Sequence, residues 1–238
     1  MDGKARIKWI AAGLAYAALF LLMQALVAGL AALAYIGGEL IAARGAIDME
    51  TVLSGFSDCI AARGLALTGA ANLATLAVTA AVYRAKKPSA FCGITDQPKK
   101  NLWPLVPLGM LMNIAVGLIF TLLPPAWIES YQTAAATVAG GMDLASILAA
   151  AVVAPVCEEV VFRGFAYSCF KKAMPRAAAI ALQGILFGVM HGQPLWIAYA
   201  VIVGAVLALM RDRYGSLLAP ITMHIAFNAV SYLPLLYA

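Results

Sequence analysis

The chain has 238 residues, of which 64% are hydrophobic and only 11% are charged. Soluble domains carry roughly 25% charged residues, so an ordinary soluble domain is excluded. The net charge of +5 is not expected to bind nucleic acid, because a chain this apolar offers no soluble basic face. Apolar runs long enough to span a bilayer, about 20 residues each, recur along the whole length. We therefore predict one all-α domain over residues 1–238, a polytopic membrane helical bundle of about seven to eight transmembrane helices.

Seven apolar segments are predicted to form the helices of this bundle. In chain order they cover residues 9–36, 65–83, 103–123, 144–170, 177–191, 195–210 and 217–237. The first two helices are expected to be joined by a loop with a short amphipathic piece, and residues 126–143 are expected to form a polar loop. Residues 1–143 thus hold three helices and their loops, and residues 144–238 form a core that carries the motifs described below. The fifth and sixth helices are short for full spans, so we expect the others to enclose them partly.

Small residues recur every four positions on two of these helices. They are Gly184, Gly188 and Gly192 on the fifth, and Ala200, Gly204 and Ala208 on the sixth. Small residues at this spacing let membrane helices approach closely. We expect close packing here, either as a general packing device or to bring His191 near a partner.

Lysine and arginine residues gather on one side of the predicted bundle. With the N-terminus in the cytoplasm, the outer loops contain only Arg44 and Arg63. The inner segments then contain Lys4, Arg6, Lys8, Arg84, Lys86, Lys87, Lys99, Lys100, Lys171, Lys172, Arg176, Arg211 and Arg213. Because cytoplasmic loops are enriched in these residues, we predict a cytoplasmic N-terminus and an outer C-terminus. The high alanine content and short loops favour a prokaryotic chain, so the expected location is the bacterial plasma membrane.

The four cysteines are scattered along the chain. Cys59 falls in a predicted outer loop, Cys92 in an inner loop, and Cys157 and Cys169 in the fourth helix. No C-x-x-C pair is present, so neither a zinc knuckle nor a disulfide framework is predicted.

Two carboxylates and an arginine interrupt the apolar fourth helix at Glu158, Glu159 and Arg163. Each such charge costs roughly 2.5 to 3.5 kcal/mol at the centre of a membrane helix, which favours a functional role. Residues i and i+4 share a helix face, so Glu159 and Arg163 are predicted to form an ion pair. Glu158 then points toward the neighbouring helices. Pro155, three residues earlier, is expected to bend the helix.

The two histidines of the chain lie on the fifth and seventh helices. His191 follows Phe187 by four residues, and Asn228 follows His224 by four residues, so each pair shares one helix face. With a rise of about 1.5 Å per residue, both histidines and Asn228 come to a depth similar to that of Glu158. A lone buried histidine is usually a core residue, but both histidines meeting a free glutamate at one depth indicate a site.

Three motifs carry a resemblance to a known family. They are Glu158-Glu159-x-x-x-Arg163, Phe187-x-x-x-His191 and His224-x-x-x-Asn228. Together they resemble the motifs of the CPBP family, which comprises CAAX prenyl endopeptidases and bacteriocin-processing intramembrane proteases and is also called the abortive-infection family. Each motif alone is weak, but all three in order on separate membrane helices form a strong signal. The resemblance covers about residues 144–237.

The resemblance implies hydrolysis of a peptide bond within the membrane. Glu158 would take a proton from a water molecule that His191 helps to position. His224 and Asn228 would donate hydrogen bonds to the oxyanion that forms at the scissile carbonyl.

The remaining motif residues would support this chemistry. Glu159 with Arg163 would hold the helix and tune the neighbouring glutamate, and Phe187 would be part of the pocket wall. The candidate catalytic residues are therefore Glu158, Glu159, His191, His224 and Asn228. The substrate would be a prenylated C-terminal CAAX peptide in the eukaryotic branch, and a leader peptide or membrane protein in a prokaryote. Membrane lipids are the other expected partners, and the oligomeric state stays open.

Two other catalytic chemistries stay open. Glu158, His191 and His224 could bind a catalytic zinc ion and leave the fourth position to water, as the family's description as metalloproteases implies. With Glu159 paired, however, Glu158 would have to serve as both ligand and base, which slightly favours a mechanism without a metal. A Cys157 nucleophile is disfavoured, because buried thiols are usually inert packing.

Two functions without proteolysis also stay open. Intramembrane glutamate and histidine residues serve proton-coupled transporters, but no inverted repeat is visible here. A non-catalytic bacteriocin-immunity or scaffold protein could share the fold, and the intact motifs argue against it.

Overall fold

The computed structural model describes residues 2–42, 48–86, 97–139 and 143–232, and every regular element in these ranges is a helix. In chain order the elements are α1 (Gly3–Ala42), α2 (Met49–Lys86), α3 (Leu105–Phe120), α4 (Pro125–Ala139), α5 (Leu144–Leu148), η1 (Ala149–Val153), α6 (Ala154–Glu158), η2 (Glu159–Ala166), α7 (Tyr167–Ala173), α8 (Arg176–Val189), α9 (Pro194–Tyr214) and α10 (Leu218–Tyr232). The elements from α5 to α7 follow one another without a break and form one central helix, Leu144–Ala173. The central helix, α1, α2 and α9 are long and apolar enough to cross a membrane. The prediction of an all-α membrane bundle is confirmed.

Two stretches that were expected to be loops are helical instead. α2 begins at Met49, so the predicted amphipathic piece, with Cys59, is the first part of a long helix. α4 occupies most of the predicted polar loop 126–143. Its sequence is rich in alanine and begins with Pro125, which suits the first turn of a helix. The prediction of loops in these two stretches relied on their polar residues and was wrong, because the helix propensity of the residues decides their structure.

Several predicted features lie outside the described residues. They are parts of the first loop (43–47), of the basic connector (87–96, with Cys92), of the polar loop (140–142) and of the last helix (233–237).

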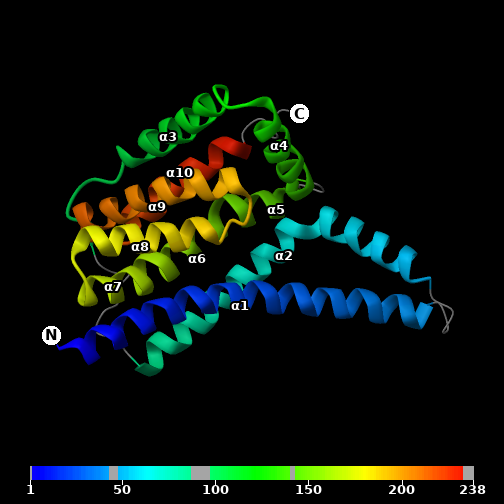
Figure 1. Cartoon of the computed structure of the whole chain (residues 1–238), viewed down its shortest axis with the longest axis horizontal. Coiled ribbons are helices and arrows are strands. Elements are labelled where there is room, and N and C mark those ends of the chain that lie inside the picture. The colour runs from blue at the N-terminus through cyan, green and yellow to red at the C-terminus, as the bar shows by residue number, and fades with distance from the viewer. Residues whose placement is uncertain (1, 43–47, 87–96, 140–142, 233–238) are drawn as a thin grey trace.

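Five helices pack side by side in the order α3, α10, α9, α8 and the central helix (Figure 1). α1 and α2 cross each other on the side of the bundle away from α3. α1 contacts α2, α7 and η2, and α3 packs mainly on α10. α4 lies at the end of the bundle where α10 ends, opposite the start of α1. The candidate site residues are carried by the central helix, by α10 and by the end of α8, which this arrangement brings together. α8 ends at Val189, so His191, predicted as the last residue of the fifth helix, lies in the turn that follows it.

An ionic cluster around Asp212 holds the end of the bundle where α1 begins. Its carboxylate accepts hydrogen bonds from Lys171 Nζ and Arg176 Nε, both at 2.8 Å, and from the Tyr167 hydroxyl at 2.7 Å. These side chains join α7, α8 and α9, so one acidic residue ties three helices together where the predicted cytoplasmic charges gather.

The small residues on α8 and α9 let these two helices meet closely. A Cβ atom added at Gly188 would lie 2.5 Å from Val201 Cγ2 and 2.9 Å from the Ile197 carbonyl oxygen. A Cβ added at Gly184 would lie 3.0 Å from the Val201 carbonyl oxygen. The close approach expected from the spacing is confirmed for these two glycines.

Candidate active site

The central helix carries two π-helical segments on either side of α6. In a π-helix the N–H of residue i bonds to the carbonyl of residue i−5, and Pro155 has no N–H to offer to Ala150. Asn228 Nδ2 donates to the Ala150 carbonyl oxygen at 3.1 Å instead. The irregularity expected at Pro155 thus appears as a π-helical segment before it, and it brings α10 against the central helix.

Glu159 and Arg163 form the ion pair that their spacing predicts. The Arg163 Nη1 to Glu159 Oε1 distance is 2.8 Å, and both side chains are fully buried. The other end of the guanidinium donates to the Gly204 carbonyl oxygen on α9 at 3.1 Å, and it stacks 4.2 Å from the centre of the Phe187 ring. Gln183 Nε2 donates to the same carbonyl at 2.7 Å. The pair therefore links the central helix to α8 and α9.

The same carboxylate also holds a histidine, which the sequence did not predict. His224 Nδ1 lies 2.8 Å from Glu159 Oε1, the oxygen that Arg163 also contacts. Because a carboxylate only accepts hydrogen bonds, Nδ1 must carry the proton, and Nε2 is directed elsewhere. Glu159 therefore fixes the orientation and the tautomer of His224.

Glu158 has a different environment from its neighbour. It lines a cavity, and its Oε2 lies 3.7 Å from His224 Nε2, which is too long for a direct hydrogen bond. The predicted division into one paired carboxylate, Glu159, and one carboxylate directed at neighbouring helices, Glu158, is confirmed.

His191 lies in the turn after α8, and its tautomer is set by the last turn of that helix. Its Nδ1 lies 2.9 Å from the Phe187 carbonyl oxygen. A carbonyl can only accept, so Nδ1 donates and Nε2 keeps a lone pair when the ring is neutral. His191 therefore offers the cavity an acceptor.

One cavity of about 580 Å³ is lined by side chains from all three motifs. Among its lining residues are Glu158, His191, His224 and Asn228. The structure thus brings together the four residues that the sequence placed at one depth, and adds Phe187 to the wall as expected.

Much of the cavity wall comes from helices that precede the motifs. Asn113 on α3 and Tyr131 on α4 line it together with Leu65 on α2. Trp196 and Tyr199 on α9 also contribute. Sequence reasoning missed all five, and the one available signal was Asn113, a polar residue in an otherwise apolar predicted helix.

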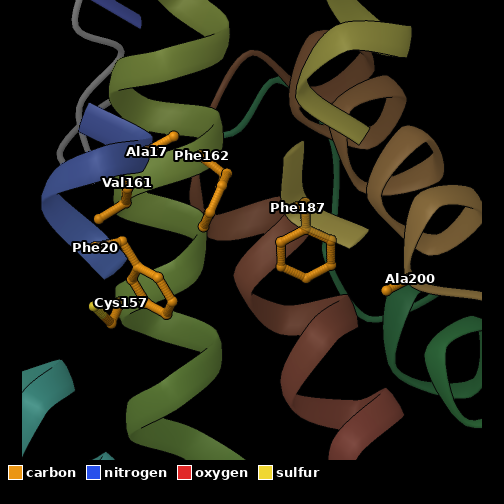
Figure 2. Packing of buried hydrophobic residues seen from close by; sticks show 7 residues of the cluster. All are labelled: Ala17, Phe20, Cys157, Val161, Phe162, Phe187 and Ala200. Atoms are coloured by element: carbon orange, nitrogen blue, oxygen red, sulfur yellow. The ribbon is translucent and has the colours of Figure 1, made fainter. Parts of the chain in front are cut away.

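Phe187 separates the site from the apolar core. Its ring lies between Phe162 of the central helix and Ala200 of α9 (Figure 2). It also stands edge-on to both histidine rings, with centroids 4.9 Å from His191 and 5.8 Å from His224. The ring is thus positioned to limit how the two imidazoles can turn.

Cys157 lies in this core and away from the cavity. It is fully buried in a cluster with Phe20, Val161 and Phe162. A buried thiol without access to substrate is packing, which disfavours the cysteine mechanism.

The residues that the zinc alternative names as ligands do not form a metal-binding group among the described residues. Among the described residues, no three side chains of histidine, cysteine, aspartate or glutamate form a group that could hold a metal ion. Glu159, the remaining carboxylate of the motif, is occupied by Arg163 and His224. This placement gives no support to the zinc ligand set, and metal dependence stays a prediction.

Comparison with known proteins agrees with the geometry. Residues 140–230 match the family model described as type II CAAX prenyl endopeptidase, Rce1-like. No significant match was found to a curated protein or to a solved structure. The matched segment contains all three motifs, so the resemblance to CPBP-type proteases is confirmed for this part of the chain. The chain has four helices long and apolar enough to cross a membrane, which indicates an integral membrane protein, and its residues 140–230 are similar to the Rce1-like family.

Proposed function

We propose that this protein is an intramembrane endopeptidase in which Glu158 activates a water molecule for attack on a peptide bond. The observation that carries the proposal is the convergence of Glu158, His191, His224 and Asn228 on one cavity. A protein with a purely structural role would have no need to direct Glu158 and both of its histidines into the same space.

The attacking water is held by two acceptors. Glu158 offers a carboxylate oxygen and His191 offers the Nε2 lone pair, since its Nδ1 is committed to Phe187. A water that donates one hydrogen to each keeps an oxygen lone pair free to attack the scissile carbonyl carbon. As the new C–O bond forms, Glu158 takes the proton.

The negative charge that develops on the carbonyl oxygen meets two donors. His224, doubly protonated, directs Nε2–H at this oxygen while Nδ1–H stays on Glu159. Asn228 uses one amide hydrogen for Ala150 and has a second one left for the oxyanion. When the C–N bond breaks, the leaving nitrogen receives the proton from Glu158, which gives a new carboxyl terminus and a new amine.

In this proposal the reaction needs no metal ion, and the substrate is a membrane-associated peptide, either lipidated or a leader sequence. The protein lies in the bacterial plasma membrane, with its N-terminus in the cytoplasm. The charge distribution supports this orientation, because α1 begins at the basic end of the bundle and α10 ends at the other.

Cleavage of a peptide library by the full chain in nanodiscs tests the proposal. Glu158→Gln should lower kcat by about 100-fold or more, because it removes the general base. His191→Ala should lower it less, and Glu50→Gln, an exposed carboxylate of α2, should leave it unchanged.

Three outcomes would overturn the proposal. A turnover rate in Glu158→Gln equal to that of wild type would show that Glu158 is not the general base. If a chelator abolished the activity and zinc restored it, the metal-free mechanism would be wrong and the zinc mechanism would be supported. Ion flux in proteoliposomes without any cleavage would favour a transporter.

A further inference from the structure

A second cavity adjoins the proposed active site where α3 meets α4. Its volume is about 680 Å³, and it shares Gly117, Phe120 and Tyr131 with the first cavity. Glu129 and Gln132 on α4 also line it. Because three residues belong to both walls, the second cavity lies next to the space where a peptide would bind at Glu158.

Aromatic rings border the junction of the two cavities. Phe120 and Tyr131 meet edge to face, with ring centroids 4.9 Å apart. Trp196 lies 6.1 Å from Tyr131, and Tyr199 lies 6.1 Å from Phe120. The faces of such rings attract ammonium and guanidinium groups, so this border favours a cationic side chain.

Apart from the two histidines, the charged side chains that line the two cavities have one sign. Among the described residues that line them, the carboxylates are Glu158 in the first and Glu129 in the second, and none is a lysine or arginine. The histidines lie at the position proposed for the scissile bond. A substrate recognised by its free C-terminal carboxylate would need a cation further along the bound peptide, and the described walls offer none.

We propose that the second cavity is a subsite for a lysine or arginine side chain of the substrate, in the segment that flanks the scissile bond, and that Glu129 determines this specificity. The inference rests on the proposed peptidase function and names its substrate class, an internal basic segment instead of a free carboxyl terminus. Glu129 is exposed, so solvent screens its attraction and the preference it gives is modest, about fivefold.

Charge reversal provides the test. Peptide pairs that differ by lysine or glutamate at each position near the cleaved bond are assayed with wild type, Glu129→Gln and Glu129→Lys. Wild type should favour the lysine peptide about fivefold in kcat/KM, Glu129→Gln should lose the preference, and Glu129→Lys should invert it. Glu50→Lys changes an exposed carboxylate of α2 that lines neither cavity, and should keep the wild-type ratio. The same lysine-to-glutamate ratio in Glu129→Lys and wild type would overturn the subsite.

Peptides with a free or an amidated C-terminus test the second half of the inference. Their kcat/KM values should agree within about twofold, since none of the described residues that line the two cavities is a lysine or arginine that could bind the carboxylate. A strong requirement for the free acid would overturn it.

A binding measurement separates this inference from the proposed function. If wild type cleaves no member of the library, the peptidase proposal fails, and the subsite is then judged on binding of labelled peptides to Glu158→Gln. A preference for the lysine peptide that Glu129→Lys inverts would support the subsite even then, and equal Kd values would reject it.

Discussion

The central helix and α1 are both long apolar helices, yet they are packed very differently. All residues of η2 in the central helix are buried, whereas only Gly13, Ala17 and Phe20 are buried along the 40 residues of α1. Lipid chains are as apolar as leucine side chains, so apolar character alone does not draw a membrane helix into the protein. What distinguishes the central helix is its polar groups, which have partners on other helices as well as on their own, and the small residues that it meets.

α1 also follows the rule that polar contacts, more than apolar character, hold membrane helices together. Its described polar contact with another helix is the hydrogen bond from Gln24 Nε2 to Asn72 Oδ1 on α2, at 2.8 Å. Beyond this residue α1 has large exposed side chains such as Leu26, Leu30 and Leu33. The hairpin of α1 and α2 is thus held by few specific contacts, and substitutions there should have small effects.

The largest difference in stability between a substitution in the central helix and one in the hairpin of α1 and α2 is expected at the buried ion pair of Glu159 and Arg163. Arg163→Ala removes the cation from the buried Glu159 carboxylate, which keeps only its contact with His224, and should lower the free energy of unfolding by about 3–5 kcal/mol. Arg63→Ala on α2 removes an exposed arginine and should have little effect. Thermal unfolding in detergent measures both, and the double variant Arg163→Ala/Glu159→Ala should recover part of the loss. Equal melting temperatures for Arg163→Ala and wild type would show that the pair does not hold the bundle.

Glycine substitutions sharpen the comparison of the two regions. Gly188→Val forces a side chain into Val201 and should cost about 1–3 kcal/mol, because α8 and α9 must move apart. Gly29→Val is the matched control on α1, where an added Cβ meets nothing within 4 Å. Thermal unfolding should place the second variant close to wild type. A similar loss at both positions would contradict the difference in packing.

Breaking the polar contact of the hairpin should have a smaller effect. Gln24→Leu removes one hydrogen bond between membrane helices and should cost about 1 kcal/mol. A double-mutant cycle with Asn72→Leu isolates the coupling between the two side chains. Leu22→Ala, on an exposed face of α1, serves as the control. A coupling energy of zero would mean that Gln24 and Asn72 do not stabilise the hairpin.

The smallest effect is expected at Asp143, which lies just before the central helix. Its carboxylate accepts a hydrogen bond from the backbone N–H of Ser146 at 2.7 Å, and this bond lowers the pKa of Asp143. A lowered pKa in the folded state means that the stabilisation is complete above the unfolded pKa and is lost as the pH falls through the folded value. Asp143→Asn keeps a capping side chain that does not titrate. The melting temperature of wild type should therefore fall relative to this variant in acid, and parallel pH curves would exclude the effect.

The chemistry of the site could be predicted where it depends on one helix alone. The spacing of Glu159 and Arg163 places them on one face, and the observed pair follows. The second bond of Glu159, to His224, joins residues 65 positions apart, so no local pattern contains it. The bond from Asn228 to Ala150 also needed the structure, because it depends on how α10 meets a π-helical segment. α4 was missed because its polar residues outweighed its alanine content in the prediction.

The amino-acid sequence by itself determined that the chain enters a membrane as helices, and which polar residues those helices carry, because hydropathy and the helical repeat are local properties. Only the tertiary structure decided that Glu158 faces a cavity while Glu159 is enclosed between Arg163 and His224. It also decided that α2, α3 and α4 complete the cavity wall and that Glu129 borders the adjoining space. The physical reason is that apolar side chains fit lipid and protein almost equally well, so helix partners are chosen by a few glycines and polar groups that meet only after folding.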